Sequence, residues 1–168
     1  MRYRLDVVAP SVTEAVTFAG GWLFDRVMAG WDVTVLLAEH SDGRPLQILG
    51  VDALDLEQAL ASWGRRPRPQ SLAVATDLFD RDSRIRLGVL KALDHGGTEV
   101  TLWGRKWPPE LDKSIDSVQH RLSAAARAFK DQALAAAAVR DVAVEPTETF
   151  GAGLTTCSSV AADLTPAS

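Results

Sequence analysis

Charged and hydroxyl side chains gather in four short segments, each of which follows a stretch of apolar and β-branched residues. The four segments are 10–13, 39–42, 77–84 and 104–107. If the apolar stretches form parallel strands, these segments converge at the carboxyl edge of one sheet, where ligands of α/β proteins bind. Their mixture of acids, bases and hydroxyls suits a phosphorylated or nucleotide ligand. The candidate ligand-binding residues are Ser11, Thr13, His40, Asp77, Arg81, Arg84, Arg105 and Lys106.

Structural roles compete with ligand binding for several of these residues. Ser11 followed three residues later by Glu14 has the form of a capping box, which satisfies free amides in the first turn of a helix. Asp80 and Ser83 are suitable caps for a later helix, and the arginines can pair with the acids beside them. The segments are therefore consistent both with a binding site and with ordinary helix starts.

No motif of catalytic or nucleotide-binding chemistry is present. The sequence contains no Gly-x-Gly-x-x-Gly after the first predicted strand, no Gly-x-x-x-x-Gly-Lys-Ser/Thr and no Gly-x-Ser-x-Gly. A single cysteine, Cys157, and three scattered histidines do not form a metal-ligand pattern. The sequence therefore predicts no catalytic residues, no metal and no cofactor, and it favours a protein that is not an enzyme.

The outline is similar to that of phospho-receiver domains. Receivers have an acidic pair at the end of the first strand, an aspartate at the end of a middle strand and a lysine after the last strand. Asp77 and Lys106 stand near two of these positions, but the first predicted strand ends with Val8, Ala9 and Pro10 and lacks the acidic pair that would hold magnesium. The resemblance implies a degenerate, non-phosphorylated relative rather than an active receiver.

The alternation of apolar and amphipathic stretches predicts an α/β fold. Strands are expected over 4–9, 31–38, 71–76 and 99–103, with a short antiparallel edge strand over 46–50. Helices are expected over 12–29, 56–63 and 83–95. We expect a mostly parallel, roughly five-stranded sheet flanked by helices, with a Rossmann-like or flavodoxin-like outline, followed by a long helix and a flexible tail.

The long helix is predicted over residues 110–141. Its apolar positions step by four and three, which is typical of a helix that packs along a partner. These positions are Leu111, Ile115, Val118, Leu122, Ala125, Phe129, Gln132, Ala136 and Val139. The first half would pack on its own domain and the second half, 124–139, would meet a second subunit. The candidate interface residues are Phe18, Trp22, Leu122, Ala125, Phe129, Ala136 and Val139.

Three regions are therefore expected. They are an α/β domain over 1–109, a helix for packing or dimerisation over 110–141, and a flexible low-complexity tail over 142–168. The predicted partner is a second copy or another protein, bound through 110–141.

The composition of the chain bears on whether it binds nucleic acid and on where in the cell it lies. The net charge of −4 does not favour nucleic acid. The basic clusters around Arg66 and around Lys106 would lie at opposite ends of a parallel sheet, so they do not form one surface. No stretch has the character of a signal peptide or a membrane span, which predicts a cytoplasmic protein without membrane contact.

The function favoured by the sequence is a non-enzymatic regulatory or protein-interaction α/β domain that self-associates through its C-terminal helix. One alternative is a small enzyme or sensor that binds a phosphorylated or nucleotide ligand at the carboxyl edge of the sheet. A further alternative is a degenerate receiver-like or nucleic-acid-binding domain.

Overall fold

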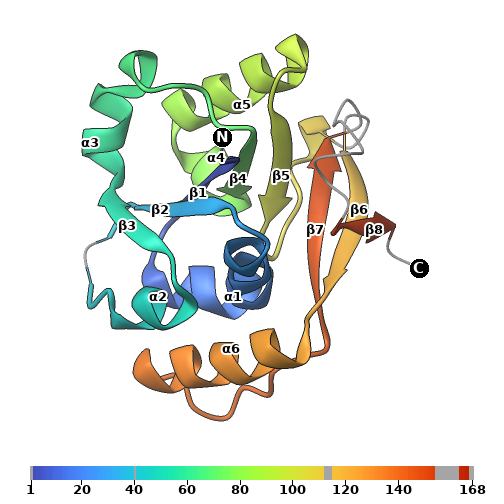
Figure 1. Ribbon diagram of the computed structural model, residues 1–168. Coiled ribbons are helices and arrows are strands. Elements are labelled where there is room, and N and C mark those ends of the chain that lie inside the picture. The colour runs from blue at the N-terminus through green and yellow to red at the C-terminus, as the bar shows by residue number, and fades with distance from the viewer. Residues whose placement is uncertain (1, 40, 112–114, 154–162, 167–168) are drawn as a thin grey trace.

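One mixed sheet runs through the protein (Figure 1). The computed structural model describes residues 2–39, 41–111, 115–153 and 163–166. The described strands lie in the order β3-β2-β1-β4-β5-β7-β6-β8, in which β1 to β5 are parallel and β7, β6 and β8 are antiparallel. Their bounds are β1 Arg4–Ala9, β2 Asp32–Leu37, β3 Asp52–Asp55, β4 Ser71–Ala75, β5 Glu99–Trp103, β6 Ile115–Arg121, β7 Thr147–Gly153 and β8 Thr165–Pro166.

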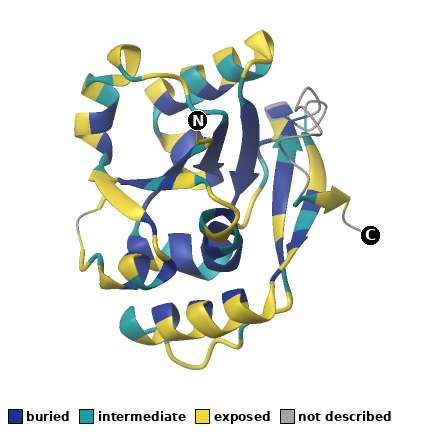
Figure 2. Cartoon of the chain, viewed as in Figure 1, coloured by how far each residue is buried: buried dark blue, intermediate teal, exposed yellow. Residues whose placement is uncertain are grey.

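Helices cover both faces of the sheet. Their bounds are α1 Val12–Met28, α2 Arg44–Leu49, α3 Leu56–Ala61, α4 Thr76–Arg81, α5 Ser83–His95 and α6 Ala124–Ala136, with short 3₁₀ turns at Trp63–Arg65 and Pro109–Leu111. One core joins the sheet to α1, α2 and α6, and the other joins it to α3, α4 and α5. Figure 2 shows the central strands buried between these layers, with the outer side of α6 exposed.

Local signals account for the first βαβ unit. Leu5, Val7 and Ala9 enter one core and Val8 enters the other, as expected for a strand covered on both faces. The Ser11 hydroxyl accepts a hydrogen bond from the Glu14 amide at 3.2 Å and so begins α1. The predicted strands over 4–9 and 31–38 therefore form a parallel pair, β1 and β2.

The predicted antiparallel edge strand over 46–50 is wrong. Residues Arg44–Leu49 form the short helix α2, with Pro45 in its first turn, where the missing amide hydrogen costs nothing. Gly50 ends this helix in a left-handed conformation, with φ of 80°. The edge strand is instead β3, which pairs in parallel with β2.

The predicted long helix over 110–141 is also wrong. Its first half contains the strand β6, in which Val118 and His120 are buried, and only Ala124–Ala136 is helical. The Ser123 hydroxyl accepts from the Ala126 amide at 3.0 Å and begins α6 there. Apolar residues three or four positions apart are typical of a helix, but they also occur in a strand whose alternate residues face a sheet. No glycine or proline marks the change from strand to helix.

The predicted flexible tail is corrected where the structure describes it. Thr147–Gly153 forms β7, which lies between β5 and β6, and Thr165–Pro166 pairs with β6 as β8. The fold is thus α/β, but its outline differs from the predicted five-stranded sheet because antiparallel strands extend the parallel ones. Cys157 lies outside the described residues.

Within the described ranges, no helix combines the length and the apolar character that a membrane crossing requires.

The contact between α1 and the start of α6 depends on Gly21. A Cβ atom added to Gly21 would overlap the Leu122 side chain, whereas one added to Gly20 would meet its nearest atoms at 3.4 to 3.5 Å. We expect Gly21→Ala to lower the free energy of unfolding by about 1–3 kcal/mol through overpacking. Gly20→Ala is the matched control and should be neutral or raise it by up to about 1 kcal/mol, because alanine favours a helix. Urea unfolding of both variants measures this, and equal effects would contradict the close packing at Gly21.

Candidate functional site

A pocket opens at the carboxyl edge of the parallel strands. It has a volume of about 340 Å³ and lies between the start of α1, the end of β4 with α4, and the end of β5. We call it the carboxyl-edge pocket, and it is lined by Glu14, Phe18, Ala75, Thr76, Asp77, Asp80, Trp103, Gly104, Arg105 and Lys106. This is the edge at which open α/β sheets bind their ligands.

The ends of the strands place the polar groups of this pocket. Helix α4 begins directly after β4, so Thr76, Asp77 and Asp80 lie at the carboxyl edge of the sheet. Arg105 and Lys106 follow β5 after a single glycine. Glu14 lies in the first turn of α1, directly after β1. The polar residues of the pocket therefore follow three different strands, β1, β4 and β5, and the parallel pairing of these strands brings them to one pocket.

Gly104 allows two walls of the pocket to meet. Its φ is +133°, and a Cβ atom there would lie 2.5 Å from the Thr76 hydroxyl oxygen. Any larger residue would be strained in its backbone and would displace Thr76. The glycine after β5 thus fixes how closely the Arg105 loop approaches α4.

Both signs of charge are present in the pocket. Asp77 is paired with Arg81 at 2.7 Å, and the Arg105 guanidinium lies 5.8 Å from the centre of the Phe18 ring. In the described part of the chain, no ion pair involves Glu14, Asp80 or Lys106. A carboxylate without a fixed partner can accept a proton, and an ammonium without one can stabilise developing negative charge.

The structure brings together only part of the predicted ligand-binding set. Asp77, Arg105 and Lys106 line the carboxyl-edge pocket. Ser11 caps α1, and Thr13 is exposed in its first turn outside the lining. His40 lies outside the described residues.

Two of the predicted arginines have other partners. Arg81 binds Asp77 at the rim, whereas Arg84 lies between Glu57 and Asp82 on the side of α3 and α5. Hydrogen bonds from Arg84 lower the pKa of both the Glu57 and the Asp82 carboxyl. The sequence predicted Glu14 only as part of a helix cap and Phe18 only as an interface residue, although the place of Glu14 in the first helical turn after a strand end was an available signal.

The predicted interface residues do not form one helical face. Trp22 and Leu122 are buried in the core, and Phe18 lines the pocket. Phe129 is 44% exposed but stacks on Phe24 with ring centres 4.6 Å apart. Ala125 is exposed, Ala136 and Val139 are half-buried, and Leu122 precedes α6. Association with a second copy stays a prediction.

Comparison with known proteins shows the fold. No family model matches the sequence, and neither does any curated protein. Among solved structures, the A40926 pseudoaglycone deacetylase Dbv21 matches with a TM-score of 0.58 at 16% identity, over 94% of this chain and 100% of that one. A deacetylase–teicoplanin complex from the teicoplanin biosynthesis pathway matches with a TM-score of 0.64 at 12% identity, over 89% and 97%. The conserved protein TT1542 from Thermus thermophilus matches with a TM-score of 0.52 at 18% identity, over 87% and 92%.

A further match, described as the zinc-inhibited form of teicoplanin deacetylase Orf2, raises the question of a metal (TM-score 0.58, 12% identity, 89% of this chain and 97% of that one). Within the described residues of the present chain, no group of three or more His, Cys, Asp or Glu side chains is placed to hold a metal ion. The carboxylates of the pocket do not converge on one point, and Asp77 is already bound to Arg81. The described side chains therefore do not fit a metal site.

The comparisons correct the function favoured by the sequence. The regulatory domain was expected to self-associate through a long C-terminal helix, and that helix is replaced by β6 and α6. The architecture is instead one that solved deacetylases also have. At these identities, what the chain shares with the deacetylases is the fold.

Proposed function

We propose that this protein is an enzyme that hydrolyses the acyl–nitrogen bond of a small, polar, N-acetylated substrate in the carboxyl-edge pocket. The observation that carries the proposal is the pocket itself, in which a carboxylate at Glu14 and the cations of Arg105 and Lys106 come together at the ligand-binding edge of the sheet. The deacetylases with the same fold support this class of reaction. The pocket volume of about 340 Å³ suits a substrate of one or two sugar rings.

The side chains can divide the reaction between them. The Glu14 carboxylate accepts a proton from a water molecule, whose oxygen then attacks the acetyl carbon. Lys106 and Arg105 stabilise the negative charge that forms on the carbonyl oxygen. The carbon–nitrogen bond then breaks, the nitrogen takes the proton from Glu14, and acetate and a free amine leave.

Acetate release from N-acetylated amino sugars and from the A40926 pseudoaglycone tests the proposal. We expect the full chain to release acetate and amine in equal amounts. Glu14→Gln should lower the initial rate by about 10²–10⁴-fold because it removes the proton acceptor. Lys106→Ala should lower it by about 10²–10³-fold because it removes charge stabilisation.

Asp131→Asn is the matched control, since Asp131 is an exposed carboxylate on α6 that does not line the pocket. Its rate should equal that of the unchanged protein. A chelator should also leave the rate unchanged, since the described side chains offer no metal site. Failure of every substrate, or equal loss of rate in Asp131→Asn and Glu14→Gln, would overturn the proposal.

A further inference from the structure

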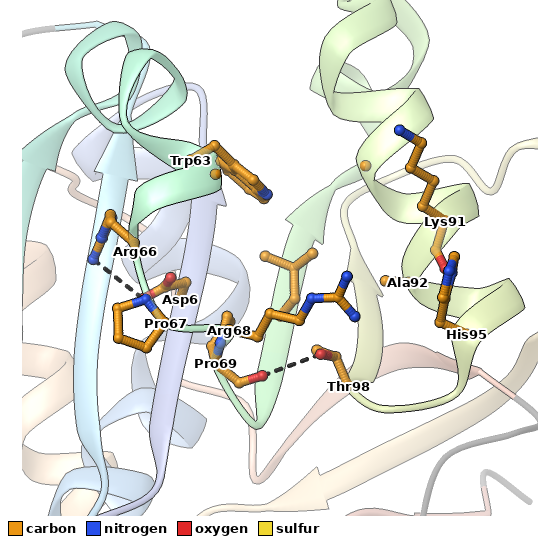
Figure 3. Close-up of a pocket in the computed structure, with 13 residues that line it drawn as sticks. Asp6, Trp63, Arg66, Pro67, Arg68, Pro69, Lys91, Ala92, His95 and Thr98 are labelled. Carbon is orange, nitrogen blue, oxygen red and sulfur yellow. Dashed lines mark hydrogen bonds and ion pairs between the residues drawn. The ribbon is translucent and has the colours of Figure 1, made fainter.

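A second pocket lies at the opposite, amino edge of the parallel strands. It has a volume of about 340 Å³ and lies between the loop that enters β4, the second half of α5 and the 3₁₀ turn at Trp63–Arg65. We call it the amino-edge pocket, and it is lined by Asp6, Trp63, Gly64, Arg66, Pro67, Arg68, Pro69, Leu72, Gly88, Lys91, Ala92, His95 and Thr98 (Figure 3). Neither the proposed reaction nor the comparisons assign a role to it.

The lining carries an excess of positive charge. Arg66, Arg68 and Lys91 are cations, and Asp6 is the acid among the lining residues. Asp6 is buried at the base, where Arg4 and Arg66 lie 3.6 and 3.9 Å from its carboxylate oxygens. Burial raises the pKa of Asp6, and the charges of these two arginines oppose that rise. The acid is thus already neutralised by its own neighbours.

Arg68 and Lys91 remain available for a ligand. Within the described ranges, neither side chain is hydrogen-bonded or ion-paired. In Figure 3, the Arg68 side chain extends from its loop toward α5, where Lys91 and His95 stand. The His95 Nδ1 lies 2.8 Å from the Lys91 carbonyl oxygen.

The loop that carries Arg68 is held in place before any ligand arrives. Pro67 and Pro69 flank Arg68 and fix the backbone on both sides. The Pro67 carbonyl accepts from the Arg4 guanidinium at 3.0 Å, and the Pro69 carbonyl accepts from the Thr98 hydroxyl at 3.1 Å. A loop that is already ordered loses little conformational freedom when a ligand binds. Arg68 is therefore better suited to ligand binding than an arginine on a mobile surface loop.

An aromatic wall completes the pocket. Trp63 is 38% exposed, and a Cβ added to Gly88 on α5 would lie 3.9 Å from its Cζ2 atom. The Trp63 ring therefore lies close to α5. Exposed indole faces bind flat organic rings, and an arginine fork binds phosphate oxygens in pairs.

We infer that the amino-edge pocket binds a small phosphorylated molecule with a flat ring, the phosphate held by Arg68 and Lys91 and the ring packed against Trp63. A nucleoside monophosphate has this chemistry and a size that fits the cavity. The inference stands apart from the proposed reaction, because the two pockets lie at opposite edges of the sheet and share no lining residue.

Isothermal titration of the full chain with AMP, inorganic phosphate and adenosine tests this inference. We expect AMP to bind at one site, more tightly than phosphate or adenosine does. Arg68→Ala should weaken AMP binding about tenfold or more, because it removes charged hydrogen bonds to phosphate. Trp63→Ala should weaken the binding of AMP while leaving that of inorganic phosphate unchanged.

Two variants serve as controls. Arg65→Ala removes the same charge from a neighbouring arginine that does not line the pocket, and Lys106→Ala alters the carboxyl-edge pocket. Both should bind AMP as the unchanged protein does. Equal weakening in Arg65→Ala and Arg68→Ala would mean diffuse charge attraction, and weakening in Lys106→Ala alone would place AMP at the other edge. Either result, or no AMP binding at millimolar concentration, would overturn the inference.

Discussion

Replacing Glu148 with alanine is expected to lower the free energy of unfolding by about 3–5 kcal/mol. Glu148 of β7 is 5% exposed, and its carboxylate lies 2.6 Å from the Lys130 ammonium of α6. The same carboxylate accepts from the amides of Gly21 at 2.9 Å and Trp22 at 2.7 Å, and Lys130 also donates to the Thr17 carbonyl at 2.9 Å. Alanine would leave a buried ammonium without its partner and two amides in the middle of α1 without this acceptor.

Urea unfolding measures the effect, and Glu145→Ala is the control because Glu145 is an exposed acid in the loop that precedes β7. Glu145→Ala should change the free energy of unfolding by less than about 0.5 kcal/mol. The pair Glu148→Gln with Lys130→Met should be more stable than Glu148→Ala, because the glutamine oxygen can still accept from one of the two amides and no charge stays buried. A double variant no more stable than Glu148→Ala would contradict the role given to the unpaired ammonium.

Arg26→Met is expected to destabilise the protein by about 3–5 kcal/mol at neutral pH. Arg26 is 2% exposed, and its guanidinium donates to both Asp163 oxygens at 2.7 and 2.8 Å and to Glu99 at 3.3 Å. It also lies between the rings of Trp22 and Trp31, whose centres are 4.8 and 4.2 Å away. Methionine would retain part of the packing but would leave the buried Glu99 carboxylate without its cation.

The stability lost in Arg26→Met should depend on pH in a defined direction. Burial raises the pKa of Glu99 above its usual value, and Arg26 opposes that rise. Because the folded state then holds the Glu99 proton more tightly than the unfolded state does, the stability from this group is present at low pH and falls as pH rises through the raised pKa. Without Arg26 the pKa of Glu99 rises further, so Arg26→Met should cost more at pH 7 than at pH 5.

Unfolding at both pH values measures this dependence. Adding Glu99→Gln to Arg26→Met should remove most of the difference between the two pH values, because the group that titrates is gone. A cost that does not depend on pH would contradict the assignment to Glu99. A cost of Arg26→Met below about 1 kcal/mol would contradict the burial of this ion pair.

The parallel half of the fold could be predicted because its signals are local. The caps at Ser11 and Asp55 bind amides three residues away, and Gly96 ends α5 in a left-handed conformation. The buried strands β1, β2, β4 and β5 are rich in apolar and β-branched residues, which is typical of strands covered on both faces. The edge at which the pocket lies followed from that parallel order.

The pocket itself could be predicted only in part. Arg105 and Lys106 follow a strand end and were found, whereas Thr76 and Glu14 belong to helices whose first turn contributes to the pocket. Gly104 lies close to Thr76 although the two are 28 residues apart in the chain, so no local sequence pattern predicts their contact. The amino-edge pocket was visible only as a basic cluster around Arg66, without the Lys91 and His95 that face it from α5.

By itself, the sequence determined the βαβ units, their caps and the edge of the sheet at which the carboxyl-edge pocket lies, because hydrogen bonds within a turn and the period of apolar residues depend on near neighbours. Tertiary structure decided the rest. Residues 115–121 are a strand because β7 pairs with them, and β7 is a strand because it lies between β5 and β6. The buried Glu148 and the half-buried Asp163 become partners of α1 across 127 and 137 residues of chain. Such contacts are made only when the whole sheet has assembled, since each group gains its partner from an element that is distant in sequence.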